Sequence, residues 1–230
     1  MKKIILFAIP ALALGLLSPQ FAQAQGTLYV SNLGLTSSSS SPVGNDSWLA
    51  VDFRTGTNAA GYSLNSFQLA LADASGNPSG FTAMLYTLGG YANPGPGSSL
   101  GTLNGSLSPV TGGIYTYSPA SNLTLSRSAT YFIVLTAATA VADGAYEWSV
   151  TSTHTFTLSG GWNGSADFFS SSDGSNWRQL GGPYPQFAIY ATDLPVPEPS
   201  TLGLLALGGC FLLWRRRKVK AVNATFFASP

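Results

Sequence analysis

Apolar and polar side chains alternate at every second position in several short stretches of this chain of 230 residues. The clearest examples are residues 49–53, 67–71 and 81–85. A period of two places the apolar side chains on one face of a β-strand, so each stretch is predicted to be a half-buried strand. Residues 131–136 are apolar on both faces, which predicts a strand in the centre of a sheet. Two further strands are predicted at residues 146–151 and 186–192.

Turn-forming residues gather between the predicted strands, and no stretch has a convincing helical period. Clusters of Gly, Pro, Asn, Asp and Ser occur at residues 75–78, 93–97, 111–113 and 173–176. Many short strands separated by such turns predict an all-β fold, specifically an antiparallel β-sandwich with jelly-roll-like connectivity. The serine run from Ser37 to Ser41 is predicted to be a flexible loop between two strands.

The first 24 residues have the three parts of a secretory signal peptide. Lys2 and Lys3 precede an apolar run from Ile4 to Leu17. Ala22 and Ala24 then form the small-x-small pattern that a signal peptidase cuts. The sequence therefore predicts export by the Sec route and a mature chain that begins at the next residue. An uncleaved N-terminal anchor is disfavoured, because the apolar run is too short and is followed by a cleavage site.

Three features follow one another near the C-terminus. They are a Pro-rich stretch at Val196, Pro197, Glu198 and Pro199, an uncharged apolar run over residues 201–214, and a basic cluster at Arg215, Arg216, Arg217 and Lys218. Each proline fixes its own φ and drives the preceding residue to extended geometry, so the first stretch is predicted to be an exposed, extended peptide. The apolar run is a minimal membrane span at about 1.5 Å per residue. The basic cluster follows the positive-inside rule and predicts a cytoplasmic tail.

Other interpretations of the C-terminal run remain open at this point. A run of this length also suits a buried core helix or an interfacial segment. A plain single-pass anchor without processing is a third possibility. A glycolipid-anchor signal is disfavoured, because such a signal is not expected to end in four consecutive basic residues followed by polar sequence. The only cysteine of the chain, Cys210, lies in the apolar run, where it is interpreted as a small apolar residue.

The three C-terminal features in this order resemble the PEP-CTERM sorting signal of Gram-negative bacteria. The resemblance implies recognition by an exosortase, a membrane cysteine enzyme that cuts near Pro-Glu-Pro and passes the protein on to the cell surface or extracellular matrix. It also implies an association with exopolysaccharide and biofilm material. Residues 219–230 follow the basic cluster, which departs from the usual pattern of the family. The predicted organisation is a signal peptide (1–24), an exported β-domain (25–194), a sorting motif (195–200), a transmembrane helix (201–214) and a basic cytoplasmic tail (215–230).

The predicted exported domain also resembles the choice-of-anchor R domain of surface proteins. The residues that carry this resemblance are Trp48-Leu49-Ala50, residues 53–56, 61–66, 123–125 and 130–132, Trp148, Gly161-Trp162 and residues 170–177. That family has no established activity, so the resemblance transfers no catalytic or binding residue.

The charge of the predicted domain excludes one class of partner. Residues 25–194 contain three arginines, no lysine and eight acidic residues, which gives a net charge of −5. A lysine-free, acidic domain lacks the basic surface that binds nucleic acid or anionic membrane surfaces. No nucleic-acid partner is expected, and the predicted contact with the membrane runs through the C-terminal helix alone.

The sequence offers little for catalysis, so no catalytic residue, metal ligand or cofactor is assigned and the protein is predicted not to be an enzyme. His154 is the only histidine, and it is interpreted as a solvated residue on a strand. A zinc site needs several His or Cys ligands, and no Gly-rich phosphate loop occurs. A glycoside hydrolase is a less favoured alternative that would draw its two carboxylates from Asp52, Asp143, Glu147 and Asp167. Calcium ligands could come from Asp73, Asn77 and Asp173, although ordinary turns are the favoured interpretation of these residues.

Aromatic residues provide the alternative function of a carbohydrate-binding module. The candidates for a sugar-stacking platform are Trp48, Trp148, Trp162, Trp177, Tyr86, Tyr91 and Tyr184. Trp162 and Trp177 lie beside Gly-rich turns and are the predicted exposed contacts, whereas Trp48 and Trp148 lie in strand patterns and are predicted to be core residues. The main prediction is a non-enzymatic surface or matrix protein, structural or adhesive, anchored in the inner membrane before it is processed.

Overall fold

The computed structural model describes residues 26–90, 94–164 and 167–196, here called the β-region. The β-region contains fifteen strands and one 3-10 turn, η1 (Val141–Asp143). In chain order the strands are β1 (Thr27–Ser31), β2 (Ser39–Val43), β3 (Trp48–Arg54), β4 (Tyr62–Gly76), β5 (Thr82–Leu88), β6 (Pro96–Asn104), β7 (Gly113–Pro119), β8 (Thr124–Leu125), β9 (Thr130–Thr136), β10 (Gly144–Thr151), β11 (Thr157–Leu158), β12 (Phe168–Ser171), β13 (Arg178–Leu180), β14 (Tyr184–Pro185) and β15 (Phe187–Asp193).

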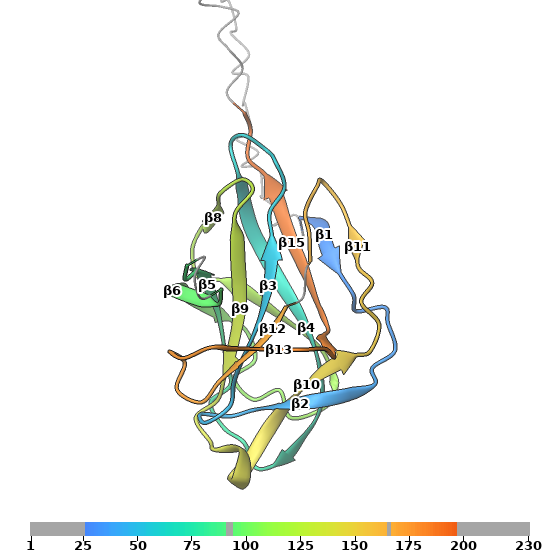
Figure 1. The fold of residues 1–230 in the computed structure, drawn as a ribbon, viewed down its shortest axis with the longest axis vertical. Helices are drawn as coiled ribbons and strands as arrows, with labels where there is room; N and C mark the ends of the chain where they lie inside the picture. Colours follow the sequence, from blue (N-terminus) through green and yellow to red (C-terminus); the bar gives the residue numbers. More distant parts are fainter. Residues whose placement is uncertain (1–25, 91–93, 165–166, 197–230) are drawn as a thin grey trace, which may run out of the picture.

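The strands form one curled antiparallel sheet (Figure 1). Its hydrogen-bonded path runs β11-β1-β15-β4-β7-β6-β5-β9-β3-β12-β13, while β10 joins β4 to β2 and β14, and β8 pairs with β4. The long strands β3, β4, β9 and β15 follow the long axis of the molecule in Figure 1. The prediction of an all-β, antiparallel fold is confirmed. The finer prediction of a jelly-roll sandwich stays a prediction.

The alternating stretches of the sequence form strands as predicted. Residues 49–53 and 67–71 lie in β3 and β4, and residues 82–85 lie in β5. The apolar run 131–136 lies in β9, which pairs with β3 on one side and β5 on the other, so its predicted central position is confirmed. The last two predicted strands correspond to β10 and β15.

A core of aromatic and aliphatic side chains fills the inside of the curled sheet. Phe53 of β3 meets Phe67 of β4 edge to face, with ring centroids 5.7 Å apart. Trp148 of β10 is fully buried, as predicted, and its Nε1–H donates to the carbonyl of Gln186 over 3.1 Å. These contacts join strands far apart in the sequence, and burying such large rings supplies most of the driving force for folding.

The serine run does not form the predicted loop. Ser39, Ser40 and Ser41 belong to β2, which pairs antiparallel with β10. The hydroxyl of Ser40 also donates to the Glu147 carboxylate over 2.8 Å. Serine has little intrinsic preference for strands, but pairing with a buried neighbouring strand overrides that preference.

The last strand of the β-region lies inside the sheet. β15 pairs with β1 on one side and β4 on the other, and Phe187, Ile189 and Ala191 are fully buried. Thr27, at the start of β1, pairs with Ala191 near the end of β15. The two ends of the β-region therefore lie side by side.

The predicted terminal segments lie outside the described residues. This applies to the signal peptide 1–24 with Ala22 and Ala24, the apolar run 201–214, and the basic tail 215–230. Within the β-region itself, no helix has the length and apolar character needed to cross a membrane.

Candidate functional site

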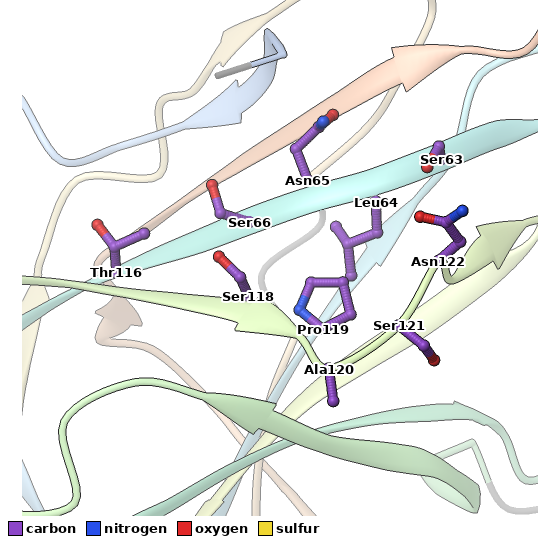
Figure 2. A pocket seen from close by; sticks show the side chains of 10 residues that line it. All are labelled: Ser63, Leu64, Asn65, Ser66, Thr116, Ser118, Pro119, Ala120, Ser121 and Asn122. Atoms are coloured by element: carbon purple, nitrogen blue, oxygen red, sulfur yellow. The ribbon is translucent and has the colours of Figure 1, made fainter. Parts of the chain in front are cut away.

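A groove of about 500 Å³ lies on the outer face of β4 and β7. Figure 2 shows the ten residues that line this polar groove: Ser63, Leu64, Asn65, Ser66, Thr116, Ser118, Pro119, Ala120, Ser121 and Asn122. The groove exists because β7 leaves β4 after the pair formed by Tyr117 and Phe67. The chain returns to β4 where the Leu123 carbonyl accepts a hydrogen bond from the Leu64 N–H, so residues 118–122 bow away between these points.

The lining of the polar groove carries hydroxyl and amide groups and no ionisable side chain. In Figure 2 the hydroxyls of Ser66, Thr116 and Ser118 gather beside one another. The Oδ1 of Asn65 accepts a hydrogen bond from Thr192 Oγ1 over 2.9 Å. A surface of this kind both donates and accepts hydrogen bonds without attracting a charged ligand.

Ser66 is the most buried polar residue of the groove. Only 7% of its surface is exposed, and its side chain lines the groove. Within the β-region the one buried side-chain nitrogen or oxygen without a hydrogen-bond partner is Trp162 Nε1, so the Ser66 hydroxyl is open to the groove, where an external group can reach it. The groove was not predictable from the sequence, because serines and an asparagine at the outer positions of a strand are typical of any solvated sheet face.

Trp162 is a core residue, so the prediction that it is exposed is wrong. Only 2% of its surface is exposed. Its ring stacks on Tyr29 and Phe53 at 4.6 and 5.9 Å and meets Tyr62 edge to face at 4.9 Å. The adjacent Asn163 forms an isolated antiparallel β-bridge with Arg54, and this backbone pairing holds the Gly-rich segment against β3. Trp162 cannot contact a sugar in the folded protein.

Trp177 lies in a second apolar cluster, on the outer face of the other half of the sheet. The buried members of this outer cluster are Ala50, Phe132, Val134 and Phe169, with Trp48, Met84, Tyr86, Leu88 and Trp177 packed partly exposed around them. Part of the Trp177 ring is reachable from solvent, so a carbohydrate contact there stays a prediction. Trp48 belongs to this outer cluster and not to the main core, which corrects its predicted placement.

The two remaining aromatic candidates lie elsewhere. Tyr184 of β14 is half-buried, and its ring centroid lies 4.4 Å from that of His154. His154 is exposed in the segment between β10 and β11, so its predicted place on a strand is wrong. Tyr91 lies outside the described residues. The candidate platform residues therefore do not form one surface.

The candidate carboxylates are divided between separate parts of the sheet. Asp52 of β3 accepts a hydrogen bond from the Asp167 backbone N–H over 2.9 Å, so these two residues are neighbours. Glu147 lies on β10 and is held by Ser40, and Asp143 lies in η1. The four candidate carboxylates therefore form two groups, Asp52 with Asp167 and Asp143 with Glu147, which lie on different elements of the β-region.

Two of the calcium candidates, Asp173 and Asp73, accept hydrogen bonds from nearby backbone N–H groups. Asp173 accepts hydrogen bonds from the backbone N–H groups of Ser175 and Asn176, and these bonds hold the pKa of its carboxyl well below the usual value. Asp73 lies within β4 and not in a loop, where it accepts a hydrogen bond from Gly112. Across the β-region, no three His, Cys, Asp or Glu side chains come together in a way that would hold a metal ion.

The end of β15 is fixed by a set of hydrogen bonds that we call the terminal clamp. The Leu194 N–H donates to the Gly61 carbonyl over 3.1 Å, and the Asn58 amide donates to the carbonyls of both Leu194 and Gly61 over 3.0 Å. The Tyr29 hydroxyl donates to Asp193 over 2.8 Å. Burial and the Asp193 carboxylate both raise the pKa of Tyr29. The chain then becomes exposed, with 52% of the Val196 surface accessible.

Comparison with known families identifies the segment that begins after the clamp. Residues 195–218 match the PEP-CTERM protein-sorting motif. The chain carries a PEP-CTERM signal. No curated protein and no solved structure has a significant match to the chain. The PEP-CTERM signal supports export, membrane anchoring before processing, and sorting by an exosortase, whereas the choice-of-anchor R resemblance stays a prediction.

The PEP-CTERM signal begins directly after the terminal clamp. Leu194 is the last residue that the clamp holds, and the signal starts at the next residue. Its Pro197, Glu198 and Pro199, and the basic residues Arg215, Arg216, Arg217 and Lys218, lie outside the described residues. The hydrogen bonds of the terminal clamp and the PEP-CTERM signal therefore adjoin each other in the sequence.

Proposed function

We propose that this protein is a non-enzymatic component of the cell surface or extracellular matrix, with a structural or adhesive role. The observation that carries the proposal is the PEP-CTERM signal placed directly after the terminal clamp. An exosortase cut near Pro197 to Pro199 separates the β-region from the membrane segment without removing a strand. The product is a complete β-region at the surface, in the exopolysaccharide and biofilm setting that the signal implies.

The arrangement of the carboxylates supports a role without catalysis. Hydrolysis of a glycosidic bond requires two carboxyl groups on either side of one substrate bond. Glu147 and Asp143 lie on β10 and η1, whereas Asp52 and Asp167 lie beside each other on β3 and before β12. The polar groove contains none of them.

The test is the intact mass of the protein recovered from membrane and extracellular fractions of whole cells. The expected extracellular species begins at Gln25 and ends between Val196 and Ser200. Replacing Pro197 and Pro199 with alanine should abolish it, because the extended peptide that the enzyme grips is lost. The matched control is Pro94→Ala in an exposed segment outside the signal. A membrane species that runs intact to Pro230 in the parent chain contradicts the proposal and leaves a plain anchor.

A further inference from the structure

We propose that the polar groove on β4 and β7 binds a segment of an uncharged polysaccharide. This inference gives a ligand class to the adhesive role proposed above and rests on that role. It places the contact on a face of the sheet that contains neither Trp162 nor Trp177. Three observations carry it: the uncharged lining, the hydroxyl of Ser66 that is open to the groove, and an aromatic ring beside it.

The charge of the groove and of the region around it selects a neutral ligand. None of the ten lining residues is ionisable, so nothing in the groove compensates a phosphate, sulfate or carboxylate. The β-region also has an excess of acidic over basic residues, which repels anionic chains. A polymer of neutral sugars matches the lining, because sugar hydroxyls, like those of serine and threonine, both donate and accept hydrogen bonds.

Ser66 occupies the centre of a row that crosses three strands. It pairs with Tyr190 of β15 on one side. On its other side, the pairing of Phe67 with Tyr117 places Ser118 of β7 next to it. The hydroxyl of Ser66 is open to the groove, so a ligand hydroxyl can exchange a hydrogen bond with it in place of solvent.

Tyr190 provides an apolar surface next to the groove, because it pairs with Ser66. Its neighbours Ile189 and Ala191 are fully buried, so the half-buried Tyr190 ring lies on the opposite, outer face with Ser66. The carbon-bound hydrogens of a sugar ring pack on such an aromatic face. The groove volume of about 500 Å³ is within the usual range of roughly 300–1,000 Å³ for ligand sites.

The test is retention of the full chain, purified in detergent, on electrophoresis gels that contain a polysaccharide. The probes are dextran, a mixed-linkage β-glucan and a galactomannan, with alginate as the anionic comparison. The parent protein should be retarded by at least one neutral polymer and not by alginate. Ser121→Trp, which fills the groove from its exposed loop, should weaken binding at least tenfold. Ser66→Ala should weaken it by about fivefold, which corresponds to one neutral hydrogen bond.

The controls distinguish binding in the polar groove from binding elsewhere on the molecule. Ser172→Trp adds the same ring to an exposed loop of the outer-cluster side and should bind like the parent. Thermal unfolding of each variant verifies that it is folded. The proposal is overturned if no neutral polymer retains the protein, or if alginate retains it equally. It is also overturned if Trp177→Ala loses retention while the groove variants keep it. Sorting is measured separately in cells. A protein that is cut and released but binds no polymer would therefore refute the proposal for the groove and leave the proposed sorting intact.

Discussion

At the scale of single residues, Trp162 illustrates how one side chain organises its surroundings. Its indole stacks on Tyr29 and Phe53, which come from β1 and β3. The close approach of Gly160 to the Tyr29 ring, where a Cβ atom would lie 2.7 Å from a ring carbon, leaves space only for glycine. Within the β-region the Trp162 Nε1–H has no hydrogen-bond partner. The residue therefore contributes through packing and not through a polar contact.

Replacing Trp162 with alanine should lower the free energy of unfolding by about 3–5 kcal/mol, because it leaves a large cavity among stacked rings. Trp177→Ala is the matched comparison, since this tryptophan is partly exposed in the outer cluster. The free energy of unfolding should fall clearly less in Trp177→Ala than in Trp162→Ala. Urea unfolding followed by circular dichroism measures both values. Equal losses for the two variants would contradict the burial assigned to Trp162.

Two buried tyrosines should make the protein sensitive to alkali. Burial is the main cause that raises the pKa of both Tyr29 and Tyr117. Tyrosine ionises near pH 10 in an unfolded chain, so stability is complete below that pH and falls as the pH rises above it. The free energy of unfolding of the parent should decline above pH 10. In a double variant that carries both Tyr29→Phe and Tyr117→Phe, the free energy of unfolding should decline less over the same pH range. Titration of phenolate absorbance with stability measurements checks this, and identical profiles would contradict it.

At the scale of elements, the terminal clamp gives the end of β15 its stability. The amide of Asn58 spans two carbonyls that come from different parts of the chain, Gly61 and Leu194. Each hydrogen bond contributes about 1 kcal/mol, and losing both leaves the strand end free to open.

Asn58→Ala should therefore cost about 1–2 kcal/mol and speed amide hydrogen exchange at the end of β15. The control is Asn45→Ala, because the Asn45 amide makes a single exposed hydrogen bond to Ala138. Exchange measured by mass spectrometry should increase at residues 191–194 in the first variant alone. Unchanged exchange there would show that other contacts hold the strand end.

Strands with an alternating pattern were predictable from the sequence, because their burial follows directly from side-chain order. β3 and β4 are examples, and the continuous apolar run of β9 indicated its central place. The pairing of these strands was not predictable, since register depends on partners distant in the chain. The serine run shows the same limit, because Ser39 to Ser41 are strand residues only through their pairing with β10.

The candidate sites show where local sequence fails. The glycines beside Trp162 indicated an exposed turn, but the segment folds inward over the Tyr29 ring. The polar groove arises from the separation of β7 from β4, which no motif encodes. The PEP-CTERM signal was predictable because its recognition depends on the order of linear features and not on a fold.

At the scale of the whole molecule, the last strand completes the sheet. β15 lies between β1 and β4, and it carries Phe187 and Ile189 into the core. A chain without β15 leaves two strand edges and a cavity in the middle of the sheet.

A chain that stops after Gln186 should therefore fail to fold, whereas one that stops after Val196 should fold like the full β-region. Both begin at Gln25, so they differ only in β15 and the clamp. Circular dichroism and thermal unfolding distinguish the two results. A cooperative transition in the shorter chain would show that β15 is not required to complete the sheet.

The side-by-side pairing of Thr27 with Ala191 has a consequence for how the chain is freed from the membrane. It puts the predicted signal-peptide cut and the PEP-CTERM signal at the same end of the β-region. A precursor that still carries both apolar segments is therefore expected to be tethered at one end of the β-region. β2 and β10 lie at the opposite end (Figure 1).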